Sequence, residues 1–153
     1  MPNTYSQLYA HIVFAVKGRQ NLIHLSWEED LYKYITGVVQ NKGQKLLAIN
    51  GMPDHLHILI GFKPDCAISD LVREIKKSTH SFINENKYCD TKFYWQEGFG
   101  VFSYNHSMLD RVIFYINNQK QHHKVKSFKE EYLEILQKFN VDFNSSYLFE
   151  FNE

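Results

Sequence analysis

Residues 53–61 read Pro53-Asp54-His55-Leu56-His57-Ile58-Leu59-Ile60-Gly61, an apolar run between a Pro-Asp pair and a glycine. Such a run predicts a buried β-strand. Side chains alternate faces along a strand, so His55 and His57 share one face, roughly 7 Å apart at Cα, while Leu56 and Ile58 fill the other. Two imidazoles at this spacing can bind one metal ion if further ligands join them. A pair of hydrogen-bonded core histidines is the alternative, so the rest of the chain has to decide.

The segments around this strand predict an antiparallel sheet with helices. Apolar residues alternate from Tyr5 to Val16, a short strand over 45–50 forms a hairpin with the His55 strand, and a last strand is expected near 101–104. Helical spacing predicts helices that begin at Ser26, Ala67, Ser107 and Ser127, with capping boxes at Ser26 and Ser107. This order indicates an α+β fold, an antiparallel sheet with helices packed on one face, of the ferredoxin-like or RNA-recognition-motif-like type.

Length and composition indicate a globular protein of ordinary size. The 153 residues predict a single domain over 1–153, in which 127–153 form a C-terminal helix and an acidic tail. The sequence shows no signal-peptide pattern and no apolar run long enough to cross a bilayer, so we expect no membrane partner. The two cysteines are too few for a disulfide framework, which favours the cytoplasm.

The charges are balanced overall but unevenly distributed. The 17 basic residues match 17 acidic ones, which at first argues against a nucleic-acid partner. However, residues 111–129 contain Lys, Arg and His but no acid, whereas the charged residues of 130–153 are acidic except for Lys138. Local basic patches therefore have to carry any binding to nucleic acid.

One helix combines an apolar face with a tyrosine and an amide. Leu109, Val112 and Ile116 define its buried stripe, and Tyr115 and Gln119 lie one turn apart on the flank. A metal held by His55, His57 and Gln119 would leave positions for a phosphate oxygen and would act as a Lewis acid. Tyr115 could then attack the phosphorus to give a phosphotyrosine and a free 3′-hydroxyl. A half-buried tyrosine bonded to a neighbour is the alternative.

Several basic residues are candidates for DNA contacts, with solvated surface charges as the alternative. They lie in the turn after the first strand, off the buried stripe of the second helix, and beside Tyr115: Lys17, Arg19, Arg73, Lys76, Lys77, Arg111 and His122. The roles of two polar residues have two interpretations each. Asp54 and His122 either support metal ligands from behind or contact DNA.

These motifs together resemble the single-tyrosine HUH transposases (TnpA type) of small bacterial insertion sequences, which transpose as single-stranded DNA. The resemblance begins at His11-Ile12-Val13-Phe14 and covers most of the chain. It continues through Met52-Pro53-Asp54-His55-Leu56-His57-Ile58-Leu59, Lys76-Lys77-Ser78, Trp95-Gln96-Glu97-Gly98-Phe99-Gly100 and Tyr115-Ile116-Asn117-Asn118-Gln119, followed by His122-His123. His-hydrophobic-His is a short pattern, and the later Tyr-x-x-x-Gln makes the combination specific.

The resemblance implies a mechanism and an assembly. His55, His57 and Gln119 would bind a divalent metal, and Tyr115 would be the nucleophile that cleaves and rejoins single-stranded DNA at hairpin-bearing element ends. The imidazoles suit Mn²⁺ and oxygen ligands suit Mg²⁺, so we expect either ion. A homodimer is implied, in which the tyrosine helix completes the partner's site in trans.

Three other functions stay open from the sequence. One is a domesticated, transposase-derived DNA-binding protein, although such a protein has no need of the full set of candidate site residues. Another is an HUH nickase of the replication initiator or relaxase type, against which the short chain argues. A third is a small-molecule metalloenzyme on a similar sheet, because a fold alone does not decide a function.

Overall fold

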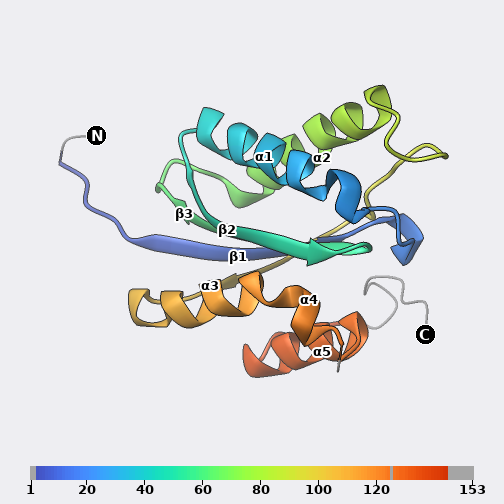
Figure 1. Cartoon of the computed structure of the whole chain (residues 1–153). Coiled ribbons are helices and arrows are strands. Elements are labelled where there is room, and N and C mark those ends of the chain that lie inside the picture. The colour runs from blue at the N-terminus through green and yellow to red at the C-terminus, as the bar shows by residue number, and fades with distance from the viewer. Residues whose placement is uncertain (1–2, 125, 145–153) are drawn as a thin grey trace.

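A four-stranded antiparallel sheet lies at the centre of the computed structural model, which describes residues 3–124 and 126–144 (Figure 1). The strands are β1 (Leu8–Ala15), β2 (Lys45–Met52), β3 (His55–Phe62) and β4 (Gly100–Ser103), in the spatial order β2-β3-β1-β4. The α+β fold, the β2–β3 hairpin and the short last strand are confirmed. The strand that carries the histidine pair is therefore an inner strand, bonded on both sides.

Two long helices, α1 (Leu25–Asn41) and α2 (Ile68–Glu85), cover one face of the sheet (Figure 1). Their apolar stripes pack on the side chains that β1 and β3 direct to that face, and this cluster includes Phe14, Leu31, Leu56, Ile58 and Ile75, all fully buried. Each such side chain stabilises the fold by about 1.5–3 kcal/mol. This layer is the predicted set of helices on one face.

The histidine face of the sheet is covered by a second helical layer (Figure 1). It comprises α3 (Leu109–Asn117), α4 (Gln119–His122) and α5 (Phe128–Lys138). His57 pairs with Val13 and His55 with Ala15, and α5 packs on these two β1 residues through Phe128, Tyr132 and Leu136. The helix with Tyr115 was expected on this face. The terminal helix was predicted too, but its position over the sheet was not.

Two helix starts differ in detail from the expectation. Helix α1 begins at Leu25 without a side-chain cap, and Glu29 of the expected Ser26 box lies 3.6 Å from Lys33 instead. Before α3, a 3-10 turn (His106–Met108) replaces the expected cap, and Ser107 donates to Asn105. The capping boxes at Ser26 and Ser107 were therefore wrong predictions.

The predicted single helix from Ser107 past Gln119 is interrupted. Asn118 has φ −102° and ψ 20°, and it separates α3 from α4. The break is stabilised by side-chain amides: Asn118 Nδ2 donates to Phe114 O, and Asn50 Nδ2 on β2 donates to Asn117 O. By contrast, Ser127 caps α5 as a capping box would, because its Oγ accepts from Glu130 N.

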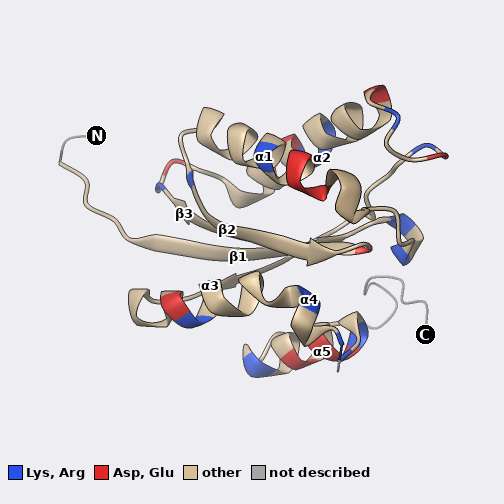
Figure 2. Ribbon diagram, viewed as in Figure 1, with Lys and Arg blue, Asp and Glu red and all other residues tan. Residues whose placement is uncertain are grey.

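Charged residues of both signs occur together on α3 and α5 (Figure 2). The separation into a basic segment and an acidic tail is thus only partly visible, since residues 145–153 of that tail lie outside the described residues. Among the residues that the structure describes, no helix is both long and apolar enough to span a membrane.

Candidate metal and tyrosine site

His55 is held by a carboxylate on its outer side. Its Nδ1 lies 2.7 Å from Asp54 Oδ1, while the other oxygen, Oδ2, accepts bonds from Arg19 at 2.9 and 2.6 Å. The Phe128 ring of α5 stacks on the imidazole at a centroid distance of 3.9 Å. Burial lowers the pKa of His55, but the bonds to Asp54 and Glu131 outweigh it, and the pKa is raised. Asp54 thus orients the ring so that Nε2 faces inward.

His57 is held in the same way by a second histidine. Its Nδ1 lies 2.8 Å from Nε2 of His11 on β1, and both rings are fully buried. Burial and the neighbouring His57 hold the pKa of His11 well below its usual range, so His11 is neutral. Its Nε2 can therefore accept a hydrogen bond from His57 Nδ1. Nε2 of His57 is therefore turned to the same interior point as Nε2 of His55.

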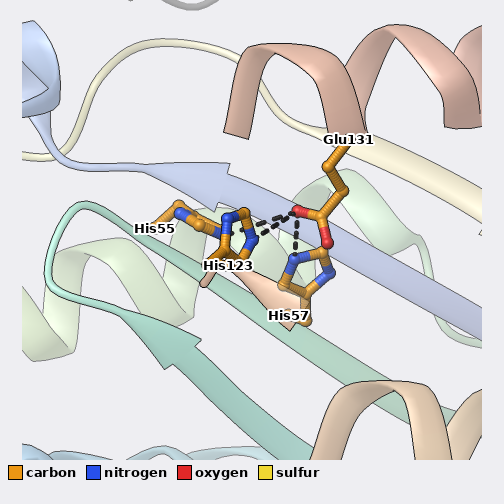
Figure 3. A group of neighbouring side chains, drawn as sticks. All are labelled: His55, His57, His123 and Glu131. Carbon is orange, nitrogen blue, oxygen red and sulfur yellow. Dashed lines mark hydrogen bonds and ion pairs between the residues drawn. The ribbon is translucent and has the colours of Figure 1, made fainter. Parts of the chain in front are cut away.

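Glu131 of α5 points from its helix to this interior point, where it meets three imidazoles (Figure 3). Its Oε1 lies 3.0 Å from His57 Nε2, 3.1 Å from His123 Nε2 and 3.5 Å from His55 Nε2. Burial would raise the pKa of the Glu131 carboxyl, but the imidazoles hold it well below its usual range. A buried carboxylate needs hydrogen-bond donors or positive charge around it, so the state of these imidazole nitrogens decides how Glu131 is stabilised.

Tyr115 and Gln119 reach the same carboxylate from α3 and α4. The Tyr115 hydroxyl donates to Glu131 Oε2, and Gln119 Nε2 donates to the same oxygen at 3.0 Å. The Tyr115 ring also lies edge-on to His57, with 5.7 Å between ring centroids. Burial and the Glu131 carboxylate raise the pKa of Tyr115, so the hydroxyl is protonated at neutral pH.

The donor set fits a divalent metal ion. The ligand atoms of His55, His57, His123 and Glu131 all lie within 4.8 Å of one another. Among the described residues, three that contact Glu131 have a buried atom without a hydrogen-bond partner: His55 Nε2, Gln119 Oε1 and His122 Nε2. Imidazole nitrogens and carboxylate or amide oxygens are ligands of Mn²⁺ and related ions, so an ion here would satisfy atoms that the protein leaves unsatisfied.

A cavity of about 340 Å³ leads to the tyrosine between α3 and α5. Tyr104, Val112 and Ile135 give it apolar walls, and Arg111 and Lys138 add positive charge. Tyr115 and Glu131 also line it, so a chain that enters the cavity meets the phenol.

The predicted basic residues fall into separate places. Arg111 and His122 lie beside Tyr115, and His122 Nε2 is 3.4 Å from Glu131. Arg73, Lys76 and Lys77 belong to α2, in the helical layer on the opposite side of the sheet from Tyr115 (Figure 1).

The two cations of the turn after β1 differ in exposure. Lys17 is exposed and lies over the Tyr94 ring, whereas Arg19 is only 8% exposed and forms the ion pair with Asp54. Arg19 therefore serves first to hold Asp54.

Sequence reasoning did not find three members of the cluster: Glu131, His123 and the supporting His11. A signal for Glu131 existed, because it lies three residues after Phe128 and one before Tyr132, on the apolar stripe of α5. An acid on a buried stripe needs a partner, and only the tertiary structure identifies that partner. Asp54 contacts the outer nitrogen of His55, as the first of its two interpretations predicts.

The fold and the site together define an α+β protein of the HUH type, with paired histidines on an inner strand and a tyrosine on a covering helix. The sequence model of one family, described as "Transposase IS200 like", matches residues 4–119. The chain belongs to this family of transposases.

Relatives with known names are consistent with this assignment. The ISDra2 transposase TnpA of Deinococcus radiodurans is 29% identical over 70 residues, which are 46% of this chain and 50% of that protein, so the chain spans about half the length of this curated relative. A crystal structure of a transposase from D. radiodurans matches with a TM-score of 0.57 at 22% identity, covering 76% of this chain and 94% of that one. A REP-associated tyrosine transposase bound to a REP hairpin matches with a TM-score of 0.60 at 19% identity, covering 79% and 72%. At these identities the two structures support the fold.

Proposed function

We propose that this chain is a metal-dependent tyrosine nuclease and strand transferase that cleaves and rejoins single-stranded DNA at hairpin-bearing ends of an insertion element. The observation that carries the proposal is the contact of Tyr115, through its ring, with His57 inside a cluster suited to a metal ion. A merely structural tyrosine has no need of such a cluster beside its hydroxyl. The structural relative with a bound DNA hairpin adds support for the substrate class.

The residues have distinct proposed roles. His55, His57 and Gln119 help to hold a divalent ion, Mg²⁺ or Mn²⁺, which when bound supplies Lewis acidity to the scissile phosphodiester. The Tyr115 oxygen attacks the phosphorus, forming a 5′-phosphotyrosine while the bond to the 3′-oxygen breaks. The phenol loses its proton, and the departing 3′-oxygen gains one and leaves as a hydroxyl. Rejoining reverses these steps with another 3′-hydroxyl.

The basic groups have a proposed role in binding the strand. Arg111 at the mouth of the cavity and His122 beside Tyr115 are placed to contact phosphates next to the cleaved bond. Lys17, Arg73 and Lys77 are exposed, so they are candidates for contacts with more distant DNA, such as a hairpin stem. Lys76 and Arg19 make internal bonds, and we assign them a supporting role.

The proposed assembly is a homodimer. In the resting chain, however, Tyr115 lies beside His57 of its own chain, so one chain contains every proposed group. Completion of the site in trans requires α3 and α4 to leave their own sheet.

A covalent-adduct assay tests the proposed chemistry. A labelled single-stranded oligonucleotide with the hairpin from the DNA that flanks the gene is incubated with the protein and Mn²⁺ or Mg²⁺. We expect a protein–DNA adduct that resists denaturation, requires the metal and maps to Tyr115 by mass spectrometry. Tyr115→Phe should abolish it, whereas the exposed Tyr94→Phe should leave it unchanged. Binding without an adduct in both metals would instead favour a recognition-only protein.

A further inference from the structure

The C-terminal helix α5 supplies a group that neither the HUH motif nor the tyrosine motif contains. Glu131 is 2% exposed and lies at the centre of the cluster, in contact with residues from β3, α3 and α4. The family match ends at residue 119, so α5 lies outside it. The role of Glu131 has to be inferred from its surroundings in this chain.

The tautomers of the histidines leave room for a cation. Asp54 is an acceptor, so Nδ1 of His55 must carry a proton, and in a neutral ring Nε2 then bears a lone pair. This lone pair faces Glu131 Oε1 at 3.5 Å, which places two acceptors opposite each other. Only a second proton on His55 or a cation between the two atoms makes this contact favourable. His57 can present a lone pair in the same way, because its Nδ1 has His11 as a partner.

The distances from Glu131 Oε1 to the imidazole nitrogens are close to those between neighbouring ligands of one ion. Neighbouring ligands about 2.1 Å from a shared ion lie about 3.0 to 3.4 Å from each other, for octahedral and tetrahedral angles respectively. The separations of Glu131 Oε1 from the three imidazole nitrogens are 3.0, 3.1 and 3.5 Å. Oε1 is thus approached by three nitrogens, more than its two lone pairs can serve by hydrogen bonds alone.

We propose that Glu131 is a metal ligand in the resting protein, so that the ion joins His55 and His57 of the sheet to α5 and latches this helix over Tyr115. The proposal rests on the proposed metal site and extends it. Gln119 Nε2 and the Tyr115 hydroxyl, which both donate to Oε2, leave Oε1 for the ion. The nucleophile and the ion are thereby connected through one carboxylate.

Direct metal binding tests this role without relying on activity. Mn²⁺ titration, followed by calorimetry or by the electron paramagnetic resonance of free Mn²⁺, gives the Kd of the full-length chain. We expect Glu131→Gln to raise Kd by about 10-fold or more, since even groups behind metal ligands change affinity by 10–100-fold. Glu134→Gln, on the exposed face of the same helix, should bind as the wild type does. Glu131→Asp keeps the charge and should lie between the two.

Hydrogen exchange tests the latch. Mn²⁺ should slow amide exchange in α5 of the wild type and of Glu134→Gln, and should leave α5 of Glu131→Gln unchanged. The variant should still fold, because Phe128, Tyr132 and Leu136 bury α5 independently, and slow exchange in β1 and β3 checks this.

The outcomes separate this proposal from the one on which it rests. Equal Kd values for wild type, Glu131→Gln and Glu131→Asp overturn the ligand role of Glu131. If His57→Ala also binds Mn²⁺ like the wild type, the metal site itself is wrong.

Discussion

His55 and His57 each have a partner that holds the ring nitrogen facing away from the proposed ion. This arrangement predicts that a residue that does not touch the ion still affects its affinity. Asp54 accepts from His55 Nδ1, so Asp54→Asn should weaken control of the tautomer and raise the Mn²⁺ Kd about 10–100-fold. The exposed Asp65→Asn serves as the control, and calorimetric titration measures both. An unchanged Kd in Asp54→Asn would show that His55 needs no carboxylate to bind the ion.

At the residue scale, the sequence predicted what short spacing determines. The His55/His57 pair follows from strand alternation, and Tyr115 and Gln119 follow from one helical turn. Glu131 and His57 are 74 residues apart in the sequence, and His11 and His57 are 46 apart. No local sequence pattern therefore indicates these two contacts. A lone acid on α5 and a lone histidine on β1 become informative only when the register and packing of the elements are known.

At the element scale, periodicity placed the strands and helices well, whereas their ends were less predictable. The expected capping box at Ser26 competes with other partners, because Glu28 contacts Tyr32 and Lys120, and Glu29 pairs with Lys33. The side chains of a capping motif can also bond to other partners, and here they do. The break at Asn118 likewise depends on Asn50 of β2, a tertiary contact that a helical pattern does not contain.

Lys76 links α2 to the aromatic segment 93–99 before β4. Its titration predicts how the stability of the protein depends on pH. Its Nζ donates to the carbonyl oxygens of Gln96 at 2.9 Å and Gly98 at 2.7 Å, and burial lowers its pKa to about 8. Between about pH 8 and 10.4, the unfolded chain then binds a proton at Lys76 that the folded chain has lost. The free energy of unfolding should therefore rise with pH in this window.

Urea unfolding at about pH 7.5, 8.5 and 9.5 measures this slope. Lys76→Arg should lose the contribution, because a guanidinium stays protonated throughout the window. Lys77→Arg, exposed on the same helix, should retain the wild-type slope. Equal slopes in all three proteins would mean that the Lys76 amine titrates at its ordinary pKa.

At the scale of the whole molecule, the sheet separates two layers with different tasks. The α1–α2 layer buries one continuous apolar cluster and sets the position of β3. The α3–α5 layer has smaller apolar clusters, one under α3 and one under α5, with the polar site between them. Stability thus comes mainly from one side, which lets the other side hold buried polar groups and the cavity that leads to Tyr115.

The contacts that fix α3 and α4 to their own sheet predict where the tyrosine acts. Lys120 Nζ lies 2.9 Å from Gly51 O and 3.1 Å from both Asn50 Oδ1 and Glu28 Oε1, while Val112 and Ile116 pack on Leu59. We expect these contacts to persist, so that Tyr115 serves the histidines of its own chain. Co-expressed His57→Ala and Tyr115→Phe chains should then form no adduct in the hairpin assay, since no chain has both groups. If the helices exchange, each mixed dimer regains one of its two sites, and about half of the dimers are mixed. Adduct formation should then recover to about one quarter of the wild-type level.

Recovery near this level would establish completion in trans, and its loss on dilution to the monomer would confirm that a dimer is required.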